Sequence, residues 1–377
     1  MIRVAALLDT HIVSGPGRQL AALASALRER DIALTVVLFH RSGRVASPYP
    51  ALLGQAGIPH RILEERGPTD LRLVGSLRRA LDELGADLLE THGYKPTTLA
   101  YLLRRSGCRL PWLAFFHGAT AENAKIRLYQ WLDRRLMRTA DRIVVMSAAQ
   151  GDAYRRLGPP VSVIYNAVIP LAEEQGAAGV GAPATRLPAD RPRLGVIGRL
   201  SPEKGVDVFL EACAVVAARG GQFEALIVGD GPERGALEQQ AGRLGLSDRV
   251  TFAGHCADMR PIYPAIDLLV LPSRSEGLPN VLLEGLRADR PVVATSVGAV
   301  PEVLFLAGSG LLVPPGDATA LAHGIENGLA TRHEPARRTA RREVAERFSL
   351  AHRVEAHVDL YHDMLGWPVA IPVTSHG

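Results

Sequence analysis

Short apolar runs alternate with longer segments of helical periodicity along the chain, and they form two series. The runs have the length of buried strands, and the segments between them have the spacing of amphipathic helices. The first series predicts strands over Val4–Leu8, Leu34–Phe39, His60–Leu63, Asp87–Thr91, Trp112–Phe116, Arg142–Met146 and Val161–Tyr165. The second predicts strands over Leu194–Ile197, Ala225–Val228, Val250–Phe252, Leu268–Leu271, Val292–Ala294 and Leu311–Val313. This alternation indicates an α/β fold with parallel, doubly wound sheets.

A stretch without apolar periodicity separates the two series. Residues 171–192 are rich in small residues, a composition typical of a linker. We therefore expect an N-terminal domain over residues 1–170, a C-terminal domain over 193–347 and a terminal segment over 348–377. In that last segment a helix, about Leu350–Leu365, is predicted from four apolar residues at helical spacing: Val354, Val358, Tyr361 and Leu365. Ligands of open α/β domains bind at the carboxyl ends of strands, so site residues are expected there.

Length and composition narrow the class of protein. A chain of 377 residues is long enough for two or three domains with cores of their own. Its three cysteines are too few and too widely spaced for a disulfide framework or a zinc cluster, which favours a reducing compartment. The apolar start of the chain is too short for a signal peptide, and no apolar run approaches the ~20 residues of a membrane span. We expect a soluble cytoplasmic protein, bound at most to the inner face of a membrane.

Positive charge is concentrated in the N-terminal half. Residues 1–170 carry a formal charge of +9 and residues 171–377 one of −5, which gives the net +4. Much of the positive charge lies in the helical pattern Lys125–Arg138, in which four residues have the spacing of a buried face: Ile126, Tyr129, Leu132 and Leu136. Either this is a packed helix with an Arg-rich outer face, which we prefer, or it docks on anionic lipid. Nucleic-acid binding is not expected, because the basic residues are not interleaved with aromatic residues in a recognition motif.

Two carboxylates are the best indication of function. Glu276 and Glu284 lie in Ser273-Arg-Ser-Glu-Gly-Leu-Pro-Asn-Val-Leu-Leu-Glu284, where a Gly-Pro loop leads into an apolar helical pattern. A helix that begins near Pro279 places Glu284 on its second turn and leaves Glu276 in the loop before it. The two carboxylates could then flank one elongated, hydroxyl-bearing, anionic ligand. An isolated pair at this spacing is more often a loop acid and a solvated helix acid, so the surrounding segments decide.

Two of those segments are Gly195-Val-Ile-Gly198-Arg199-Leu-Ser-Pro-Glu-Lys204-Gly205 and Pro291-Val-Val-Ala-Thr-Ser-Val-Gly-Ala-Val-Pro-Glu302. Together with the Glu276 segment they resemble the family 4 glycosyltransferases, which are retaining enzymes that use nucleotide sugars. The resemblance is strongest over residues 193–315. It implies the GT-B fold, in which two Rossmann-like domains face each other across a cleft and the last helix returns to the N-terminal domain. It also implies a nucleotide-sugar donor, with a UDP-sugar as the default, and no cofactor.

The resemblance assigns roles to residues around the expected donor site. Arg199 and Lys204 would neutralise the diphosphate, and Gly198 would let the ligand approach the backbone. Lys204 is one of only three lysines in this Arg-rich chain, which hints at a site that Arg cannot serve. Glu276 would orient sugar hydroxyls and Glu284 would bind the ribose. The remaining donor-site candidates are Gly277, Leu278 and Pro279, next to Glu276, and His255, near the base.

Candidates in the N-terminal domain follow predicted strands. Gly15 and Gly17 lie in a Gly-rich loop after the first strand that resembles the family's first loop, although Pro16 interrupts it and removes a donor. His117 ends the strand Trp112–Phe116, and the resemblance places it beside the transferred sugar, with a catalytic contribution. His92 and Lys95 end another strand and could bind a hydroxyl or phosphate of the acceptor. A glycan, a lipid-linked sugar or a small molecule remains open as acceptor.

Other functions were weighed against glycosyl transfer. The chain has no Asp-x-Asp tripeptide of the kind that holds a divalent metal in GT-A enzymes, so we expect no metal. The implied reaction is a front-face transfer in which the leaving phosphate takes the acceptor proton, so no side-chain nucleophile is named. A nucleotide-sugar isomerase or hydrolase and a catalytically silent sugar-nucleotide-binding protein are the alternatives. Polysaccharide or glycoconjugate biosynthesis is the expected setting.

Overall fold

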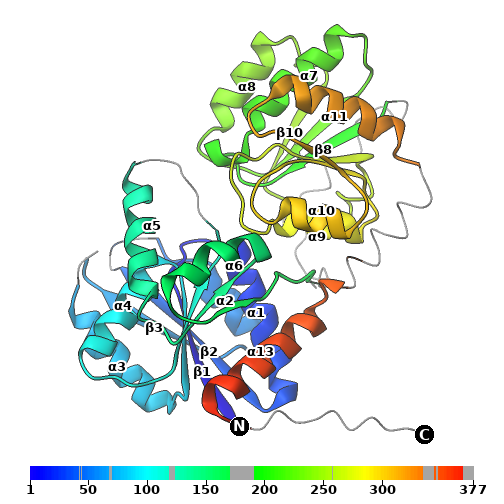
Figure 1. Cartoon of the computed structure of the whole chain (residues 1–377). Helices are drawn as coiled ribbons and strands as arrows, with labels where there is room; N and C mark the ends of the chain where they lie inside the picture. Colours follow the sequence, from blue (N-terminus) through cyan, green and yellow to red (C-terminus); the bar gives the residue numbers. More distant parts are fainter. Residues whose placement is uncertain are drawn as a thin grey trace, which may run out of the picture. The chain divides into compact units, whose positions relative to one another are not determined.

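The chain forms two compact units, each built around one parallel sheet (Figure 1). The structure, a computed structural model, describes residues 1–41, 43, 45–67, 70–118, 124–169, 191–256, 258–333, 344 and 347–367, without the side chains of 124–127. Unit 1 comprises residues 1–117, 125–167 and 350–377, and unit 2 comprises 118–124 and 168–349. The predicted linker, residues 171–192, lies almost entirely outside the described residues.

Unit 1 contains a seven-stranded parallel sheet in the order β3-β2-β1-β4-β5-β6-β7. Its strands are β1 (Ile2–Leu8), β2 (Ile32–Arg41), β3 (His60–Glu65), β4 (Leu88–His92), β5 (Trp112–Phe116), β6 (Arg142–Val145) and β7 (Val161–Val163). Its helices are α1 (Gly15–Leu27), α2 (Tyr49–Gln55), α3 (Arg72–Leu84), α4 (Tyr94–Arg105), α5 (Ala124–Met137), α6 (Ala148–Tyr154) and α13 (Leu350–Leu365). Every residue of β4 and β5 is buried, as expected for a parallel sheet covered on both faces.

Unit 2 contains a six-stranded parallel sheet in the order β10-β9-β8-β11-β12-β13. Its strands are β8 (Arg193–Ile197), β9 (Glu224–Val228), β10 (Val250–Gly254), β11 (Leu268–Leu271), β12 (Val292–Thr295) and β13 (Leu311–Val313). Its helices are α7 (Val206–Ala218), α8 (Arg234–Arg243), α9 (Asn280–Arg287), α10 (Val300–Leu306) and α11 (Ala318–Ala330). In Figure 1, α7, α8 and α11 lie on one side of this sheet and α9 and α10 on the other. Phe209 and Phe223 are fully buried in its core.

The predicted fold class is confirmed. Each strand predicted from the sequence is present, with ends that differ by at most two residues, and both sheets are doubly wound. Local capping accounts for several helix starts. Ser14, Ser147 and Asp317 accept hydrogen bonds from the backbone N–H groups of Gly17, Gln150 and Ala320, which stabilises the first turns of α1, α6 and α11.

The last helix belongs to unit 1, although it follows unit 2 in the sequence. α13 packs beside α1 (Figure 1). Its buried face includes Val354, Leu360 and Tyr361, and the hydroxyl of Tyr361 donates a hydrogen bond to Glu90 in β4. The chain therefore leaves unit 1 after β7 and returns to it at Leu350.

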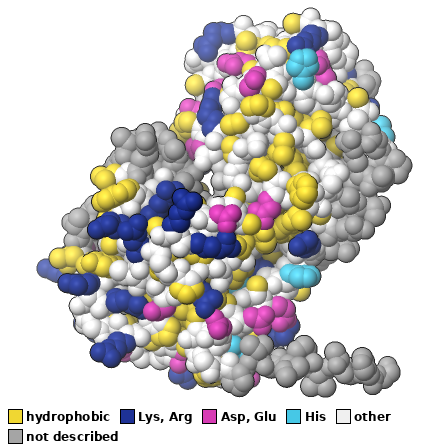
Figure 2. Space-filling model, in the orientation of Figure 1, with side chains coloured by type: hydrophobic (Ala, Val, Ile, Leu, Met, Phe, Trp, Pro, Cys, Tyr) yellow, Lys and Arg dark blue, Asp and Glu magenta, His cyan; other side chains and the backbone are white. Residues whose placement is uncertain are grey.

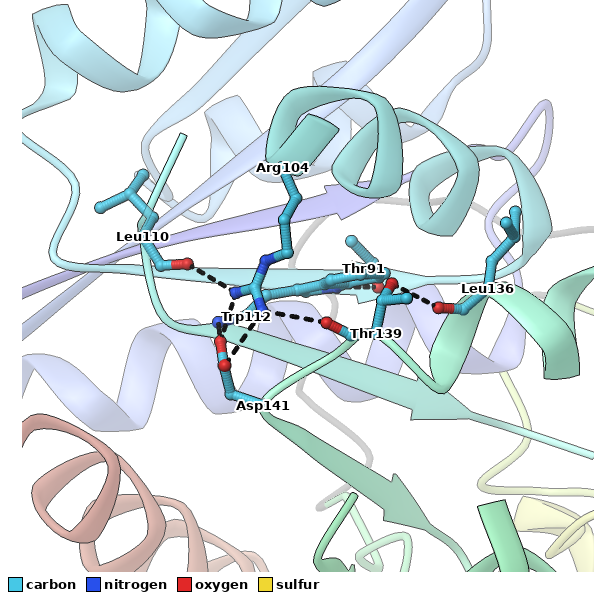
Figure 3. A network of polar contacts seen from close by, with 7 residues as sticks. All are labelled: Thr91, Arg104, Leu110, Trp112, Leu136, Thr139 and Asp141. Carbon is cyan, nitrogen blue, oxygen red and sulfur yellow. Dashed lines mark hydrogen bonds and ion pairs between the residues drawn. The ribbon is translucent and has the colours of Figure 1, made fainter. Parts of the chain in front are cut away.

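A polar clamp in unit 1 joins α4 to the starts of β5 and β6 (Figure 3). Arg104 contacts both carboxylate oxygens of Asp141, at 3.0 and 2.5 Å, and also donates to the carbonyl oxygens of Leu110 and Thr139. Asp141 in turn accepts the backbone N–H of Trp112. The guanidinium lies over the Trp112 ring, and the indole N–H donates to Thr91. This clamp lies at the amino ends of the strands, the edge opposite to the candidate site residues of unit 1.

Candidate active site

The sheet of unit 2 reverses its strand order between β8 and β11, and a pocket lies where these two strands end. Successive strands are added on one side of β8 up to β10 and on its other side from β11 onward. Ligands of doubly wound sheets bind at such a switch point, outside the carboxyl ends of the strands. The pocket is lined by residues from β8, β11 and the segments that follow them: Val196, Ile197, Gly198, Arg199, Lys204, Val206, Val270, Leu271, Pro272, Ser273, Glu276, Pro279 and Val281.

An ion pair crosses this pocket. Lys204 Nζ lies 2.6 Å from Glu276 Oε1, and the hydroxyl of Ser273 donates to the same oxygen at 2.7 Å. The Glu276 side chain is only 9% exposed, whereas that of Lys204 is 28% exposed. A lysine ammonium carries three N–H donors, so the contact with Glu276 leaves donors for a second group. Lys204 can thus hold a carboxylate and an anionic ligand at the same time.

Backbone contacts hold the Lys204 segment against the loop after β11. Lys204 ends the 3-10 turn Pro202–Lys204, and Gly205 follows with a φ of +63°. A Cβ on Gly205 would lie 2.2 Å from the carbonyl oxygen of Pro272, so this close approach requires glycine. Arg274 adds a second connection, because its backbone N–H donates to the carbonyl of Glu203 and its guanidinium binds both carboxylate oxygens of Asp207.

Arg199 supplies a second positive charge to the pocket. It follows Gly198 directly after β8, at the carboxyl edge of the sheet. Its side chain is exposed and makes no hydrogen bond or ion pair with the residues that the structure describes. Arg199 and Lys204 therefore bring positive charge to one pocket, and only the charge of Lys204 is compensated by a nearby acid. This arrangement suits a ligand with more than one negative charge.

Glu276 and Glu284 lie as the sequence predicted. Helix α9 begins at Asn280 after the N-cap residue Pro279, so Glu284 is on its second turn and Glu276 is in the preceding loop. The hydroxyl of Tyr263 donates to Glu284 Oε2 at 2.5 Å. The loop is supported from β12 and the turn after it, because Thr295 donates to the carbonyl of Ser273 and Ala299 N–H donates to that of Gly277.

The other predicted donor-site residues of unit 2 lie around this loop. Gly198 and Pro279 line the pocket, whereas Gly277, Leu278 and Glu284 are next to it in sequence without lining it. Leu278 is buried. His255 is exposed directly after β10, two strands away from β8, and is not part of the pocket lining. The structure therefore brings together Arg199, Lys204 and Glu276, and leaves His255 apart from them.

In unit 1 two predicted residues form a pair. His92 is the last residue of β4 and His117 follows β5, and these strands are neighbours. His92 Nδ1 lies 2.8 Å from His117 Nε2. Burial lowers the pKa of His117 well below its ordinary value, and electrostatic interactions with His92 and Arg353 lower it further. His117 is therefore neutral at physiological pH.

Comparison with known families identifies the chain. Residues 13–170 match the family described as Glycosyltransferase Family 4, and residues 191–331 match the family described as Glycosyl transferases group 1.

The chain belongs to the family 4 glycosyltransferases.

Curated relatives are similar in sequence to part of this chain. Alpha-D-kanosaminyltransferase from Streptomyces kanamyceticus is 32% identical over 208 residues, which is 53% of this chain and 54% of that protein. A 2-deoxystreptamine glucosyltransferase from the same organism is 30% identical and covers 63% of each chain. The match thus spans between half and two thirds of the length of these two relatives. The lipopolysaccharide core biosynthesis mannosyltransferase LpcC from Rhizobium leguminosarum bv. viciae is 29% identical over 70% of this chain and 75% of LpcC.

Solved structures share the fold over nearly the whole chain. The crystal structure of Anabaena Alr3699/HepE in complex with UDP-glucose aligns with a TM-score of 0.79 and 22% identity, over 96% of this chain and 100% of that chain. A sucrose-phosphate synthase from Thermosynechococcus elongatus aligns with a TM-score of 0.78 and 22% identity, over 97% and 100%. The two units therefore have the GT-B fold, as predicted.

In the Gly-rich loop, the backbone groups of Gly17 are already hydrogen-bonded within unit 1. The N–H of Gly17 donates to the Ser14 hydroxyl at 3.2 Å, and the Tyr49 hydroxyl donates to the carbonyl of Gly17 at 2.7 Å. Gly15 is the first residue of α1, and Pro16 follows it. Because the N–H of Gly17 already donates to the N-cap residue Ser14, a phosphate role for Gly15 and Gly17 remains a prediction.

Lys95 is engaged inside unit 1. Its ammonium lies 2.7 Å from Glu65 Oε2 and 3.5 Å from Asp9 Oδ1, and it sits over the ring of Phe39. The Glu65 side chain is 3% exposed and also pairs with Arg41 at 3.0 Å. The charge of Lys95 is therefore compensated by a buried acid, which does not favour the predicted contact with an acceptor phosphate.

Sequence reasoning missed the partners of the predicted residues. Ser273 and Tyr263 orient the two glutamates, and Glu90 and Arg353 lie around the histidine pair. For Glu90 a signal was present, because a charged residue inside the apolar run Asp87–Thr91 must be buried with a partner. Ser273 lies only three residues before Glu276, in the same motif. Tyr263 and Arg353 come from distant segments, and nothing in their local sequence marks them.

The predicted buried face of the basic helix was wrong at Leu132, whereas Tyr129 and Leu136 are half-buried. Leu132 is 38% exposed, and Ile126 lies among the side chains that are not described. Among the side chains of α5 that the structure describes, the fully buried ones are Asp133 and Met137. Burial of Asp133 raises its pKa to about 6, an effect opposed by a hydrogen bond from Thr97. The periodicity of α5 is helical as predicted, but its packed face is rotated relative to the apolar stripe.

Proposed function

We propose that the chain is a retaining, metal-independent glycosyltransferase that moves a sugar from a nucleotide sugar to a hydroxyl acceptor. The observation that carries this proposal is the pocket of unit 2, which holds Arg199, Lys204 and Glu276 at the switch point of the sheet. Two cations and one carboxylate match two adjacent parts of a nucleotide sugar, the anionic diphosphate and the hydroxyl-bearing sugar attached to it. Membership of family 4 supports the same reaction class.

Each pocket residue has a defined part in the proposed reaction. The bond between the sugar C1 and the β-phosphate oxygen breaks, and a bond from C1 to the acceptor oxygen forms. Arg199 and Lys204 offset the negative charge that develops on the leaving diphosphate, as fixed positive charges in a partly buried pocket do most effectively. The acceptor proton passes to the departing phosphate. Glu276 orients sugar hydroxyls, and Glu284 binds those of the ribose.

A UDP-sugar is the favoured donor. Alr3699/HepE, which shares the fold, was crystallised with UDP and with UDP-glucose. For the acceptor, the relatives range from a 2-deoxystreptamine glucosyltransferase to a lipopolysaccharide core mannosyltransferase. We infer a hydroxyl-rich glycan, lipid-linked sugar or small molecule as acceptor, in glycoconjugate biosynthesis.

Nucleotide binding tests the donor site first. The melting temperature of the protein should rise with one of UDP, GDP or ADP in the presence of EDTA, because ligand at 100-fold its Kd adds about 2.7 kcal/mol to stability. Lys204→Met should remove most of this rise. Arg287→Met is the matched control, since Arg287 is an exposed cation at the end of α9. No rise with any nucleotide in folded protein would contradict the proposal.

Product analysis separates transfer from the alternative activities. The protein would be incubated with nucleotide sugars of the nucleotide that binds and with a panel of acceptors. We expect a new glycoside whose anomeric configuration, determined by NMR, equals that of the donor. Release of free sugar without glycoside would instead indicate a hydrolase, and conversion of the donor sugar an isomerase. Nucleotide binding without any product would indicate a catalytically silent protein.

We further propose that α5 binds anionic membrane. Leu128 and Trp131 are 59% and 60% exposed, beside Leu132. Arg135 on the helix and Arg138 directly after it are exposed, and Figure 2 shows apolar and basic side chains next to one another over α5. An apolar face edged by arginine matches the acyl and phosphate layers of a bilayer surface. Among the described residues, none of the helices has the length and hydropathy needed to span a bilayer.

Vesicle co-sedimentation tests the membrane surface. Binding to phosphatidylserine-containing vesicles should exceed binding to phosphatidylcholine vesicles, and it should weaken with salt. Trp131→Ser should weaken binding at both low and high salt. The double variant Arg135→Glu with Arg138→Glu should abolish the part of the binding that salt weakens. Arg134 is left intact, because it donates to the Tyr154 hydroxyl and packs on that ring. Equal binding by all variants would reject the proposal.

A further inference from the structure

A buried carboxylate stands behind the histidine pair of unit 1. Glu90 in β4 is fully buried, and Tyr361 of α13 donates to its Oε1 at 2.7 Å. His92 Nε2 lies 3.4 Å from Glu90 Oε2, close enough for an electrostatic contact but without hydrogen-bond geometry. Neither of these two atoms has a hydrogen-bond partner in the described part of the chain, so their contact with each other is not offset by a hydrogen bond to another group.

Glu90 is ionised in this setting. Burial would raise the pKa of Glu90, but its interactions with His92, His357 and the Tyr361 hydroxyl outweigh that effect and hold the pKa below its ordinary value. Tyr361 stays protonated, because burial and the charge of Glu90 raise its pKa well above the ordinary value. The two groups therefore keep their roles as acceptor and donor across the neutral range.

The remaining titratable groups nearby are on α13 and have contacts of their own. His357 Nδ1 lies 2.7 Å from the carbonyl oxygen of Arg353 and must donate to it. Burial lowers the pKa of His357 to about 3, so it stays neutral. The guanidinium of Arg353 donates to the carbonyl of Tyr165 and to the side chain of Asn166. None of these groups takes over the contact between Glu90 and His92.

The charge of Glu90 then determines where the histidine protons lie. A lone pair on His92 Nε2 would be repelled by the carboxylate oxygen 3.4 Å away, whereas an N–H there is attracted. In neutral His92 the proton is therefore on Nε2, and Nδ1 is an acceptor. His117 Nε2, 2.8 Å from that acceptor, must carry the proton of His117. The second nitrogen of His117, Nδ1, is left with a lone pair.

We propose that Glu90 is a positioning residue that fixes the tautomers of His92 and His117, so that His117 presents Nδ1 as a hydrogen-bond acceptor after β5. An acceptor nitrogen recognises a hydroxyl and repels phosphate and carboxylate oxygens. The ligand class that it selects is thus a neutral hydroxyl of a sugar, and this last step rests on the proposed function. The tautomers themselves do not depend on what the enzyme transfers.

NMR of the full-length protein tests the tautomers directly. Protein labelled with 15N-histidine would be recorded at pH 8 by long-range 1H–15N correlation, which distinguishes protonated from unprotonated ring nitrogens. The signals would be assigned by their loss in His92→Gln and His117→Gln. We expect Nε2 to be protonated and Nδ1 to be unprotonated in both residues. A proton on Nδ1 of His117 in the wild-type protein would overturn the proposal.

Glu90→Gln provides a second test with a predicted reversal. Tyr361 donates to Oε1, so the amide oxygen of glutamine should occupy that position and its NH2 group should face His92 Nε2. An NH2 donor requires a lone pair on Nε2, which moves the proton of His92 to Nδ1. His117 must then accept at Nε2 and carry its proton on Nδ1. Unchanged tautomers in folded Glu90→Gln would contradict the role of Glu90.

Tyr361→Phe is the matched control, because it removes a contact of Glu90 but keeps the carboxylate opposite His92. We expect wild-type tautomers in this variant. Transfer assays add a functional measurement: Glu90→Gln should lower kcat/KM by roughly tenfold or more and leave UDP affinity unchanged, since the pocket residues are in unit 2. A protein with the expected tautomers but without transfer activity would contradict the proposed function and leave the tautomer assignment in place.

Discussion

Glu276 and Glu284 are both carboxylates, but their surroundings give them different tasks. Glu276 is held by Lys204 and Ser273, so its position is fixed before a ligand binds. Glu284 accepts only from Tyr263 among the side-chain contacts of the described residues. Under the proposed function, Glu276 lies at the sugar, where bonds change, and Glu284 lies at the ribose, where none do.

This difference predicts opposite kinetic signatures for two matched variants. Glu276→Gln should lower kcat by about 10- to 100-fold, because a charged hydrogen bond near the reacting sugar contributes about 1.5–3 kcal/mol. Glu284→Gln should mainly raise KM, because the ribose is bound equally in the ground and transition states. Steady-state kinetics with the identified donor measures both. The same pattern in both variants would show that the two roles are assigned incorrectly.

At the scale of elements, the pocket depends on how closely the turn Pro202–Lys204 approaches the end of β11. Gly205 makes that approach possible, since a Cβ there would lie 2.2 Å from the carbonyl oxygen of Pro272. Gly220 also has a positive φ, but its Cβ would meet nothing within 4 Å. An alanine at Gly220 would therefore meet backbone strain alone, whereas an alanine at Gly205 would meet both backbone strain and steric overlap.

Substituting these glycines tests the packing of the pocket. Gly220→Ala should cost roughly 1–2 kcal/mol in unfolding free energy, from backbone strain alone. Gly205→Ala should cost more, about 3 kcal/mol or above, because backbone atoms must also move. It should weaken nucleotide binding as well, since Lys204 is the preceding residue. Urea denaturation and UDP titration measure both effects, and equal values for the two variants would argue against the close approach.

The clamp of Arg104 and Asp141 predicts a loss of stability in acid (Figure 3). Burial alone would raise the pKa of Asp141, but the hydrogen bonds from Arg104 and from the N–H of Trp112 hold it below its ordinary value. The folded state thus binds this proton more weakly than the unfolded state, whose pKa is about 3.9. The contribution is complete above that value and is lost as pH falls through the lower folded pKa.

Urea unfolding between pH 7 and pH 3 measures this contribution. Asp141→Asn should be less stable than the wild type at pH 7, and the difference between them should shrink below about pH 4. Asp152→Asn is the control, because Asp152 is exposed and contacts only Arg155 through its side chain among the described residues. A constant difference at all pH values would show that the Asp141 charge is not what stabilises the clamp.

The sequence predicted what is encoded locally. Strands, the start of α9 and the positions of Arg199, Lys204 and Glu276 follow from short patterns and from the family resemblance. Contacts between distant segments were not accessible, because nothing in the local pattern states which partner a charge will find. Lys95 pairs with Glu65, 30 positions away, and Tyr361 reaches Glu90 across 271 positions. The exposure of Leu132 in α5 was not predicted for the same reason, since the buried face of a helix depends on which neighbouring elements pack against it.

At the scale of the whole molecule, the chain passes from unit 1 into unit 2 at Val168 and returns to unit 1 after Ser349, and the segments at these two crossings are bonded to each other. Val168 N–H donates to the carbonyl of Phe348 at 2.7 Å, and Val168 forms a parallel bridge with Ser349. Unit 1 is therefore completed only when α13, from the end of the chain, packs beside α1. Each unit nevertheless has a sheet and a buried core of its own.

Separate cores predict separate responses to mutation and to nucleotide. Calorimetry should resolve two transitions, and the ligand nucleotide should raise only the one that belongs to unit 2, because the pocket lies there. Leu360→Ala in α13 should lower the other transition by several degrees, since a buried Leu→Ala costs about 2–5 kcal/mol and each kcal/mol corresponds to about 2–4 °C. Leu321→Ala in α11, equally apolar and buried, should lower the nucleotide-sensitive transition instead. If both variants shifted the same transition, the two cores would unfold as one cooperative unit, and the position of the nucleotide site in a self-contained unit 2 would have to be given up.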